Sequence, residues 1–194
     1  MNKPPVNKVR SLFFIRCCAV VVIVAATAGA YLYSGWYPIG ADSPHNAFTF
    51  WALETLREQS IHRASSGVVV PADLDSPERL LAGGADYNDM CAGCHLKPGL
   101  AQSDFSLGLY PAPPNLSLET QDDEAGAEDK NARAREHFWV IKHGIKASGM
   151  PAWGYGHDDN RIWNMVAFLQ RLPDLSPQQY QILTARRQGE HDHH

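Results

Sequence analysis

The stretch NDMCAGCHLKPG, residues 88–99, holds two cysteines and a histidine in the pattern Cys-x-x-Cys-His. Such residues serve as a redox dithiol, as zinc ligands or as a haem attachment site. A thioredoxin-like dithiol needs a strand–helix–strand context, and no segment of useful length alternates apolar and polar residues. A structural zinc site needs further Cys or His ligands at short spacing, and none follows His95. The pattern therefore favours covalent haem, with Cys91 and Cys94 as tethers and His95 as an axial ligand of the iron.

A second axial ligand is expected in the loop SGMPAWG, residues 148–154. A glycine before Met150 permits close approach of the backbone, and the proline after it stiffens the chain. A thioether sulfur is a soft ligand, and Met opposite His raises the reduction potential of haem iron. Met90 and Met165 fall on helical segments, where packing explains them. The sequence thus predicts His95 and Met150 as the two axial ligands.

Composition excludes one class of partner and separates two groups of cysteines. The 194 residues carry a formal net charge of −4 and contain no basic patch interleaved with aromatic residues, so no nucleic acid is expected as a partner. The cysteines occur as Cys17 with Cys18 and Cys91 with Cys94. Because sequence neighbours rarely meet disulfide geometry, we expect Cys17 and Cys18 to act as small apolar residues.

The N-terminal region predicts a membrane-spanning helix. Residues 12–33 are almost entirely apolar and follow a basic stretch without acidic residues. At about 1.5 Å per residue such a helix can cross a hydrocarbon core of about 30 Å. The positive charges place residues 1–11 in the cytoplasm and the later residues on the periplasmic side of a bacterial inner membrane. The alternative is a signal peptide cleaved at Ala28-x-Ala30, although the apolar run continues past that site.

A linker with an amphipathic helix follows, over residues 34–71. We expect the helix at about 44–65, with Ser43 as its N-cap and the following proline at its first position. Four apolar residues recur at helical spacing and form one stripe. They are Phe48, Trp51, Ala52 and Leu56. This stripe packs on the following domain, lies at the membrane surface, or docks a partner subunit.

The compact domain is expected at residues 72–173, followed by a C-terminal tail at 174–194. Its expected helices share cap and stop residues: Ser76 and Pro77 begin the first, Gly144 ends the second, and Asp158 or Asp159 begins the last. These helices cover residues 77–95, 134–143 and 160–172. Between them we expect a proline-rich loop at 103–121 and a polar, mostly acidic surface stretch at 122–136.

Residues 72–173 resemble a class I c-type cytochrome, of the monohaem, His/Met, membrane-anchored bacterial type. The matching pieces are GADYNDMCAGCH, YPAPPNLS, FWVIKHGIKASGMPAWG and IWNMVAFLQRL. The resemblance implies an all-α cytochrome c fold, with three to four helices around one covalent haem c, preceded here by the transmembrane helix. It also implies that two helices cross, with Gly84 and Tyr87 against the face of Trp163, Phe168 and Leu169.

The same resemblance implies the surroundings of the haem. The carbonyl of Pro113 or Pro114 would accept the ring N–H of His95, and the choice between them stays open. Tyr110 and Trp153 would line the pocket or approach a propionate, and plain packing explains them equally well. The remaining histidines of the domain are expected at the surface or in loops. They are His137, His143 and His157.

Function follows from a six-coordinate iron that leaves no open site for substrate. The expected role is one-electron transfer with redox partners such as a quinol–cytochrome c reductase, a dehydrogenase or a terminal oxidase, and not enzymatic turnover. The alternative is a fixed haem subunit of a larger membrane oxidoreductase or oxidase complex. A peroxidase or haem sensor is disfavoured, because one motif gives one haem and Met150 would close the iron. The acidic region at 119–136 is either solvated or a docking face for a basic partner.

Overall fold

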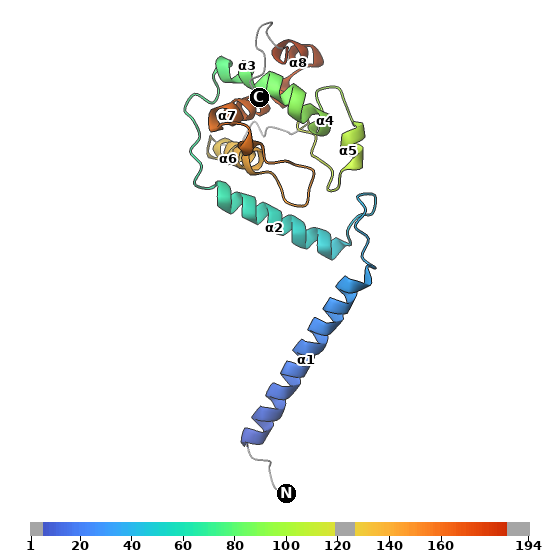
Figure 1. Cartoon of the computed structure of the whole chain (residues 1–194). Coiled ribbons are helices and arrows are strands. Elements are labelled where there is room, and N and C mark those ends of the chain that lie inside the picture. Colours follow the sequence, from blue (N-terminus) through green and yellow to red (C-terminus); the bar gives the residue numbers. More distant parts are fainter. Residues whose placement is uncertain (1–5, 119–126, 186–194) are drawn as a thin grey trace. The chain divides into compact units, whose positions relative to one another are not determined.

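The computed structural model describes residues 6–118 and 127–185, and every regular element within those ranges is helical. This confirms the predicted all-α class. The chain divides into two units, Met1–Ser43 and Pro44–His194. Figure 1 labels the α-helices: α1 Val6–Ser34, α2 Ala47–Ser65, α3 Pro77–Asp86, α4 Ala92–His95, α5 Asp104–Gly108, α6 Ala127–His143, α7 Asp159–Leu169 and α8 Pro177–Leu183. Three short turns complete the order: η1 Tyr87–Cys91, η2 Trp153–Tyr155 and η3 Leu172–Asp174.

Helix α1 dominates the first unit. An 18-residue window within its portion Arg10–Ser34 has a mean hydropathy of 2.3, and this portion is long and apolar enough to cross a membrane. Large apolar side chains along it are exposed, Val22 among them. In water such a surface would be costly, so the helix fits a membrane anchor by length and composition. The predicted span of residues 12–33 lies inside this helix.

Helix α2 begins later than predicted. The side chain of Asn46 accepts the backbone N–H of Thr49 at 3.0 Å, so Asn46 is the N-cap. Ser43 instead closes a turn, with its N–H donating to the carbonyl of Gly40. The expectation of Ser43 as cap is therefore wrong, because a closer asparagine satisfies the free N–H groups of the first turn.

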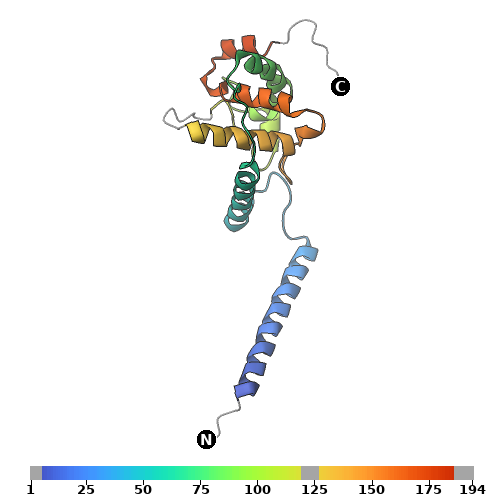
Figure 2. The same ribbon diagram turned by 90° about the vertical axis from the view of Figure 1, so that its left-hand side faces the viewer.

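Of the three alternatives for the apolar stripe of α2, the structure excludes packing on the domain for its three large side chains. Phe48, Trp51 and Leu56 are all exposed. Helix α2 contacts α6 instead through its later turns, where Ser65 is buried and His62 lies 3.1 Å from Glu136. Figure 1 shows α2 lying beside α6, and Figure 2 gives the same unit from the side.

The segment with the Cys-x-x-Cys-His pattern is helical throughout, as predicted. Ser76 caps α3 and Pro77 is its first residue. The helix then widens into the π-turn η1 before α4. The sequence offered no sign of this π-turn, a feature that often occurs at functional sites.

Helices α3 and α7 cross at a pair of glycines. A Cβ at Gly83 would overlap the carbonyl oxygen of Asn164, and a Cβ at Gly84 would lie 3.1 Å from the Phe168 ring. The ring of Tyr87 lies 5.4 Å from that of Phe168. The predicted crossing is thus found for Gly84, Tyr87 and Phe168, and Gly83 makes the closest approach.

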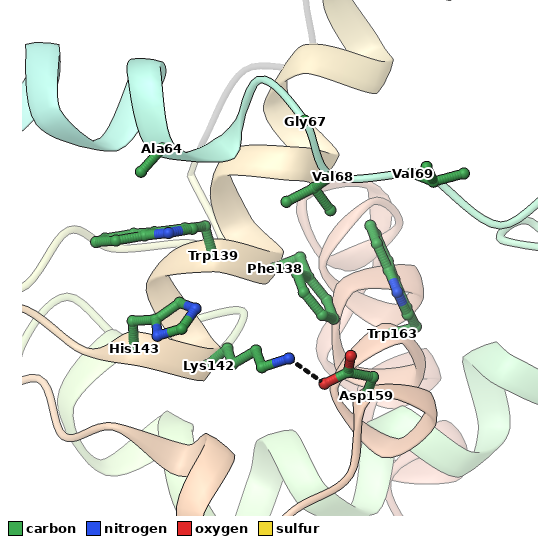
Figure 3. A pocket seen from close by; sticks show the side chains of 10 residues that line it. All are labelled: Ala64, Gly67, Val68, Val69, Phe138, Trp139, Lys142, His143, Asp159 and Trp163. Carbon is green, nitrogen blue, oxygen red and sulfur yellow. Dashed lines mark hydrogen bonds and ion pairs between the residues drawn. The ribbon is translucent and has the colours of Figure 1, made fainter.

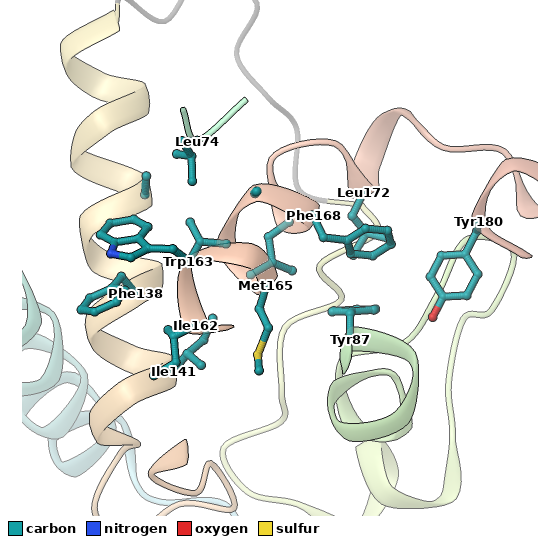
Figure 4. Close-up of a cluster of buried hydrophobic side chains, with 14 residues drawn as sticks. Leu74, Tyr87, Phe138, Ile141, Ile162, Trp163, Met165, Phe168, Leu172 and Tyr180 are labelled. Carbon is teal, nitrogen blue, oxygen red and sulfur yellow. The ribbon is translucent and has the colours of Figure 1, made fainter. Parts of the chain in front are cut away.

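The core of the second unit is a cluster of aromatic and aliphatic side chains along α7, shown in Figure 4. Trp163 turns toward α6, where it stacks on Phe138 with ring centroids 4.3 Å apart. Trp163 thus belongs to the α6–α7 contact, whereas Phe168 faces α3. Ile162, Val166 and Leu172 are fully buried between these two contacts.

Three other segments differ from prediction. The proline-rich segment contains α5, because Ser103 and Ser106 form a reciprocal capping box before the prolines begin. Helix α6 starts within the stretch expected to be a polar surface, at Ala127. The expected tail contains α8, whose Tyr180 is buried against Tyr87 and Phe168. Residues 119–126, with most of the acidic residues of the predicted acidic region, and residues 186–194, with the His-rich end, lie outside the described residues.

A groove of about 520 Å³ lies where the chain leaving α2 passes α6 and α7 (Figure 3). Lys142 donates to Asp159 at 2.6 Å across one side of it. Val68 packs against the core, whereas Val69 points outward. The end of α2 and the residues after it therefore pack against the hydrophobic core of the second unit.

Candidate haem site

Cys91, Cys94 and His95 lie on one short stretch formed by the end of η1 and by α4. Both cysteines are free thiols, and all three side chains are half-buried. The helix stops at Leu96, whose φ of 66° is in the left-handed region that L-residues rarely adopt. The hydroxyl of Tyr87 donates to the carbonyl of Leu96 at 2.6 Å and to that of His95 at 3.3 Å. Tyr87 therefore holds the strained turn that follows His95.

The ring of His95 is oriented by the proline-rich loop. Its Nδ1 lies 3.0 Å from the carbonyl oxygen of Pro114, so the structure selects Pro114 over Pro113. The N–H of Leu116 donates back to the carbonyl of His95 at 3.2 Å. Burial lowers the pKa of His95, and the bond to Pro114 opposes this in part. A neutral ring that donates from Nδ1 leaves the Nε2 lone pair for a metal.

The environment of the cysteines argues against a redox dithiol. Burial, with Asp86 and Cys94 nearby, raises the pKa of the Cys91 thiol to about 12. Redox-active and zinc-binding cysteines react as thiolates and have lowered pKa values. In addition, no three His, Cys, Asp or Glu side chains of the described ranges converge as a metal cluster. A neutral, half-buried Cys91 thiol agrees instead with a role as a covalent tether.

Met150 is held by a tight loop after α6. Gly144, with a φ of 65°, ends α6, and a Cβ there would lie 2.8 Å from the carbonyl oxygen of Met150. The same carbonyl accepts the N–H of Ile145 at 3.1 Å, and the N–H of Met150 donates to Ser148 Oγ at 3.1 Å. The Met150 side chain is partly buried and packs against the same core as Cys91.

These residues fit a haem attached through thioether bonds. The two free thiols and an imidazole with a preset tautomer lie on one helical turn, and a partly buried thioether borders the same core. A soft sulfur and a neutral nitrogen suit low-spin haem iron. When bound there, haem would supply reversible one-electron exchange between its ferric and ferrous states. A family described as cytochrome c oxidase, cbb3-type, subunit III matches residues 78–169, the segment that contains all four side chains.

Residues 78–169 form a c-type cytochrome domain.

A cytochrome domain of this kind is an electron-transfer haem domain and is not an enzyme by itself. Domains of the cbb3 type function in redox complexes with other proteins. The match begins in the first turn of α3 and ends with the last residue of α7, so it spans the crossing helices and the Met150 loop. No curated protein and no solved structure matches the chain.

Two further residues were expected near the haem of the cytochrome domain. Tyr110 is engaged by the start of α2: its hydroxyl accepts the N–H of His45 at 3.1 Å, and the two rings meet edge-on. Trp153 lies in η2, packs partly against the core and meets the His157 ring edge-on. Trp153 thus stays near Met150, whereas Tyr110 joins the cytochrome domain to α2.

One of the three remaining histidines differs from expectation. His143 is exposed, as expected. The Nδ1 atom of His137 is buried, and burial, with Arg133 and His95 nearby, lowers its pKa to about 4. Both ring nitrogens of His157 are buried as well. His157 lies in the loop between η2 and α7, as expected, whereas the expectation is wrong for His137. Buried Ala134 and Ile141, three residues before and four after His137, share its helix face, and this apolar spacing was the available signal.

An ion pair of the cytochrome domain was missed by sequence reasoning. Arg161 at the start of α7 donates two hydrogen bonds, of 2.7 and 2.8 Å, to the carboxylate of Asp86 at the end of α3. Asp86 is buried, and its charge contributes to the raised pKa of Cys91. The pair ties the helix before the cysteines to α7. Its members are 75 residues apart, so no local pattern could indicate it.

Proposed function

We propose that this chain is a membrane-anchored, monohaem c-type cytochrome that carries single electrons on the periplasmic side of a bacterial inner membrane. Cys91 and Cys94 form the thioether bonds, and His95 and Met150 are the axial ligands. The observation that carries the proposal is the His95–Pro114 hydrogen bond, which leaves Nε2 as the metal-binding nitrogen. Trp153 lines the haem pocket, and the Pro114 carbonyl orients the proximal ring.

The proposed partners are redox proteins: a quinol–cytochrome c reductase, a dehydrogenase or a terminal oxidase. Electron-transfer encounters use small interfaces, typically below about 1,200 Å². Anchoring by α1 raises the effective concentration of the domain for partners in the same membrane. The N-terminus is then cytoplasmic, because the basic residues precede the span.

A second candidate function is a fixed haem subunit of a larger membrane oxidoreductase or oxidase complex. The matching family, subunit III of the cbb3-type cytochrome c oxidase, is an oxidase subunit, which favours this candidate. Both candidates use the same haem ligands and the same one-electron chemistry. They differ in whether the protein is extracted from the membrane as a single chain or together with partner subunits.

The test starts from the full-length protein extracted from membranes in mild detergent. Haem that stays with the chain after denaturation, at one haem per chain, is the expected result. Loss of that haem in the double variant Cys91→Ser/Cys94→Ser, with Cys17→Ser/Cys18→Ser as the matched control that keeps it, assigns the tethers. A chain without covalent haem, or with two haems, overturns the proposal. Sizing of the extract separates the two functions, because a carrier elutes as a single chain and a fixed subunit elutes with partners.

A further inference from the structure

The first half of α2 exposes large apolar side chains that no described part of its unit covers. Phe48, Trp51, Leu53 and Leu56 are 73%, 61%, 50% and 66% exposed, and we call them the α2 apolar face. The rings of Phe48 and Trp51 lie 5.9 Å apart and form a joint surface. Helix α2 thus carries most of its large apolar side chains in its first half, whereas the second half, which starts at Arg57, is mostly polar.

Contacts at both ends of α2 keep the α2 apolar face at the surface of its unit. Before the helix, the N–H of His45 donates to the hydroxyl of Tyr110 at 3.1 Å, and the two rings meet edge-on at 5.2 Å. Near its end, His62 lies 3.1 Å from Glu136 on α6, and Ser65 is buried. These contacts use the polar half and the residues before the helix, so the apolar half stays at the surface of its unit.

The chain leading to α2 argues for a lipid occupant. Residues 35–46 join α1 to α2, and an extended chain of that length spans at most about 40 Å. Trp36 and Ile39 on this connection are also strongly exposed, so exposed apolar side chains continue from the end of α1 into α2. Trp and Phe side chains partition to the membrane interface, so the exposed Phe48–Trp51 pair suits that layer.

We propose that the α2 apolar face inserts into the interfacial layer of the bilayer that α1 anchors to. This inference rests on the proposed anchoring by α1. It gives the cytochrome domain a second membrane contact, through a helix fixed to α6. The domain is then held in a restricted orientation at the membrane, and partners embedded in the same membrane meet a limited part of its surface.

The test uses the full-length holoprotein with Cys17→Ala and Cys18→Ala, in vesicles of phosphatidylethanolamine and phosphatidylglycerol at less than one chain per vesicle. Single cysteines are placed by Phe48→Cys and Leu56→Cys. The matched control is Gln59→Cys, on the same side of α2 as Phe48 about three turns later. At each position the rate with a charged maleimide is divided by the rate with an apolar one, which cancels differences in thiol reactivity. The haem spectrum of each variant verifies that the domain is folded.

We expect this ratio to be at least about tenfold lower at positions 48 and 56 than at 59. Equal rate ratios at all three positions overturn the inference, and the α2 apolar face would then be a contact surface for a protein partner. Protection that appears only at high protein density also overturns it, because a second copy then covers the face. A further variant, Val22→Cys in α1, separates the two proposals: a thiol there that reacts quickly with the charged reagent overturns the anchoring itself.

Discussion

The Nδ1 atom of His95 lies 3.0 Å from the carbonyl oxygen of Pro114, 19 residues later in the chain. This contact joins the Cys-x-x-Cys-His turn to the proline-rich loop. Burial lowers the pKa of His95, so the ring is neutral at neutral pH and donates from Nδ1. The fold itself therefore favours the tautomer that leaves the Nε2 lone pair available to the proposed haem iron.

Removal of the proposed sixth ligand gives the first prediction. Met150→Ala should convert low-spin iron into high-spin or water-ligated iron and lower the reduction potential by on the order of 0.1 V, because a thioether favours the ferrous state. The near-infrared band of Met-ligated ferric haem should disappear. Met165→Leu, at a buried core position, is the control and should keep the band. An unchanged spectrum in Met150→Ala would refute the ligand assignment.

The hydroxyl of Tyr87 stabilises the turn after His95. Tyr87→Phe removes its bonds to the carbonyls of Leu96 and His95, and Leu96 has a strained backbone. We expect a loss of about 1–2 kcal/mol in the free energy of unfolding, with the haem spectrum retained. Denaturant titration of the holoprotein measures this loss. Tyr155→Phe, at an exposed tyrosine, should cost almost nothing, and equal effects of the two variants would contradict the assignment.

The crossing of α3 and α7 depends on Gly83. A methyl group there would overlap the backbone carbonyl of Asn164, and backbone cannot move aside as a side chain can. Gly83→Ala should therefore destabilise the domain by about 3 kcal/mol or more, or prevent haem incorporation. Gly108→Ala is the matched control, because a Cβ at that position meets open space. Thermal unfolding of both variants tests the prediction, and a stable Gly83→Ala variant would show that the helices do not cross this closely.

The Asp86–Arg161 pair supports the helix that precedes the cysteines. Arg161→Gln leaves the buried Asp86 charge without its guanidinium, and we expect a cost of about 2 kcal/mol, because the arginine is partly exposed. The double variant Asp86→Asn/Arg161→Gln should recover part of that loss, since no buried charge remains. Chemical unfolding of the single and double variants measures the difference. If the two substitutions lower the free energy of unfolding additively, the interaction between Asp86 and Arg161 makes no contribution to stability.

The lowered pKa of His137 should make the protein less stable in acid. Its pKa is lowered from 6.5 to about 4 in the folded protein, chiefly by burial. A base with a lowered folded pKa stabilises the fold fully above the unfolded value and loses that contribution as pH falls from about 6.5 toward 4. The free energy of unfolding should drop by at most about 3 kcal/mol over this interval. His137→Asn should flatten the pH dependence, and a variant with an unchanged slope would exclude His137 as the cause.

The sequence by itself determined the local features of this protein. Ser76 with Pro77 begins α3 as predicted, and Asp158, one of the two aspartates predicted, caps α7, because cap chemistry acts over three or four residues. The spacing of Cys91, Cys94 and His95 predicted a haem site, and the Gly and Pro around Met150 predicted the proposed second ligand. These are short-range rules, and each of them is satisfied within one helical turn or one loop.

Tertiary structure decided the features that depend on distant partners. It selected Pro114 over Pro113, paired Asp86 with Arg161, and placed Tyr180 of the expected tail beside Tyr87. It also left Phe48 and Trp51 exposed, although their helical spacing alone would have allowed packing on the domain. Helical periodicity shows which side chains share a face, but only the packing of separate helices determines whether protein, water or lipid covers that face.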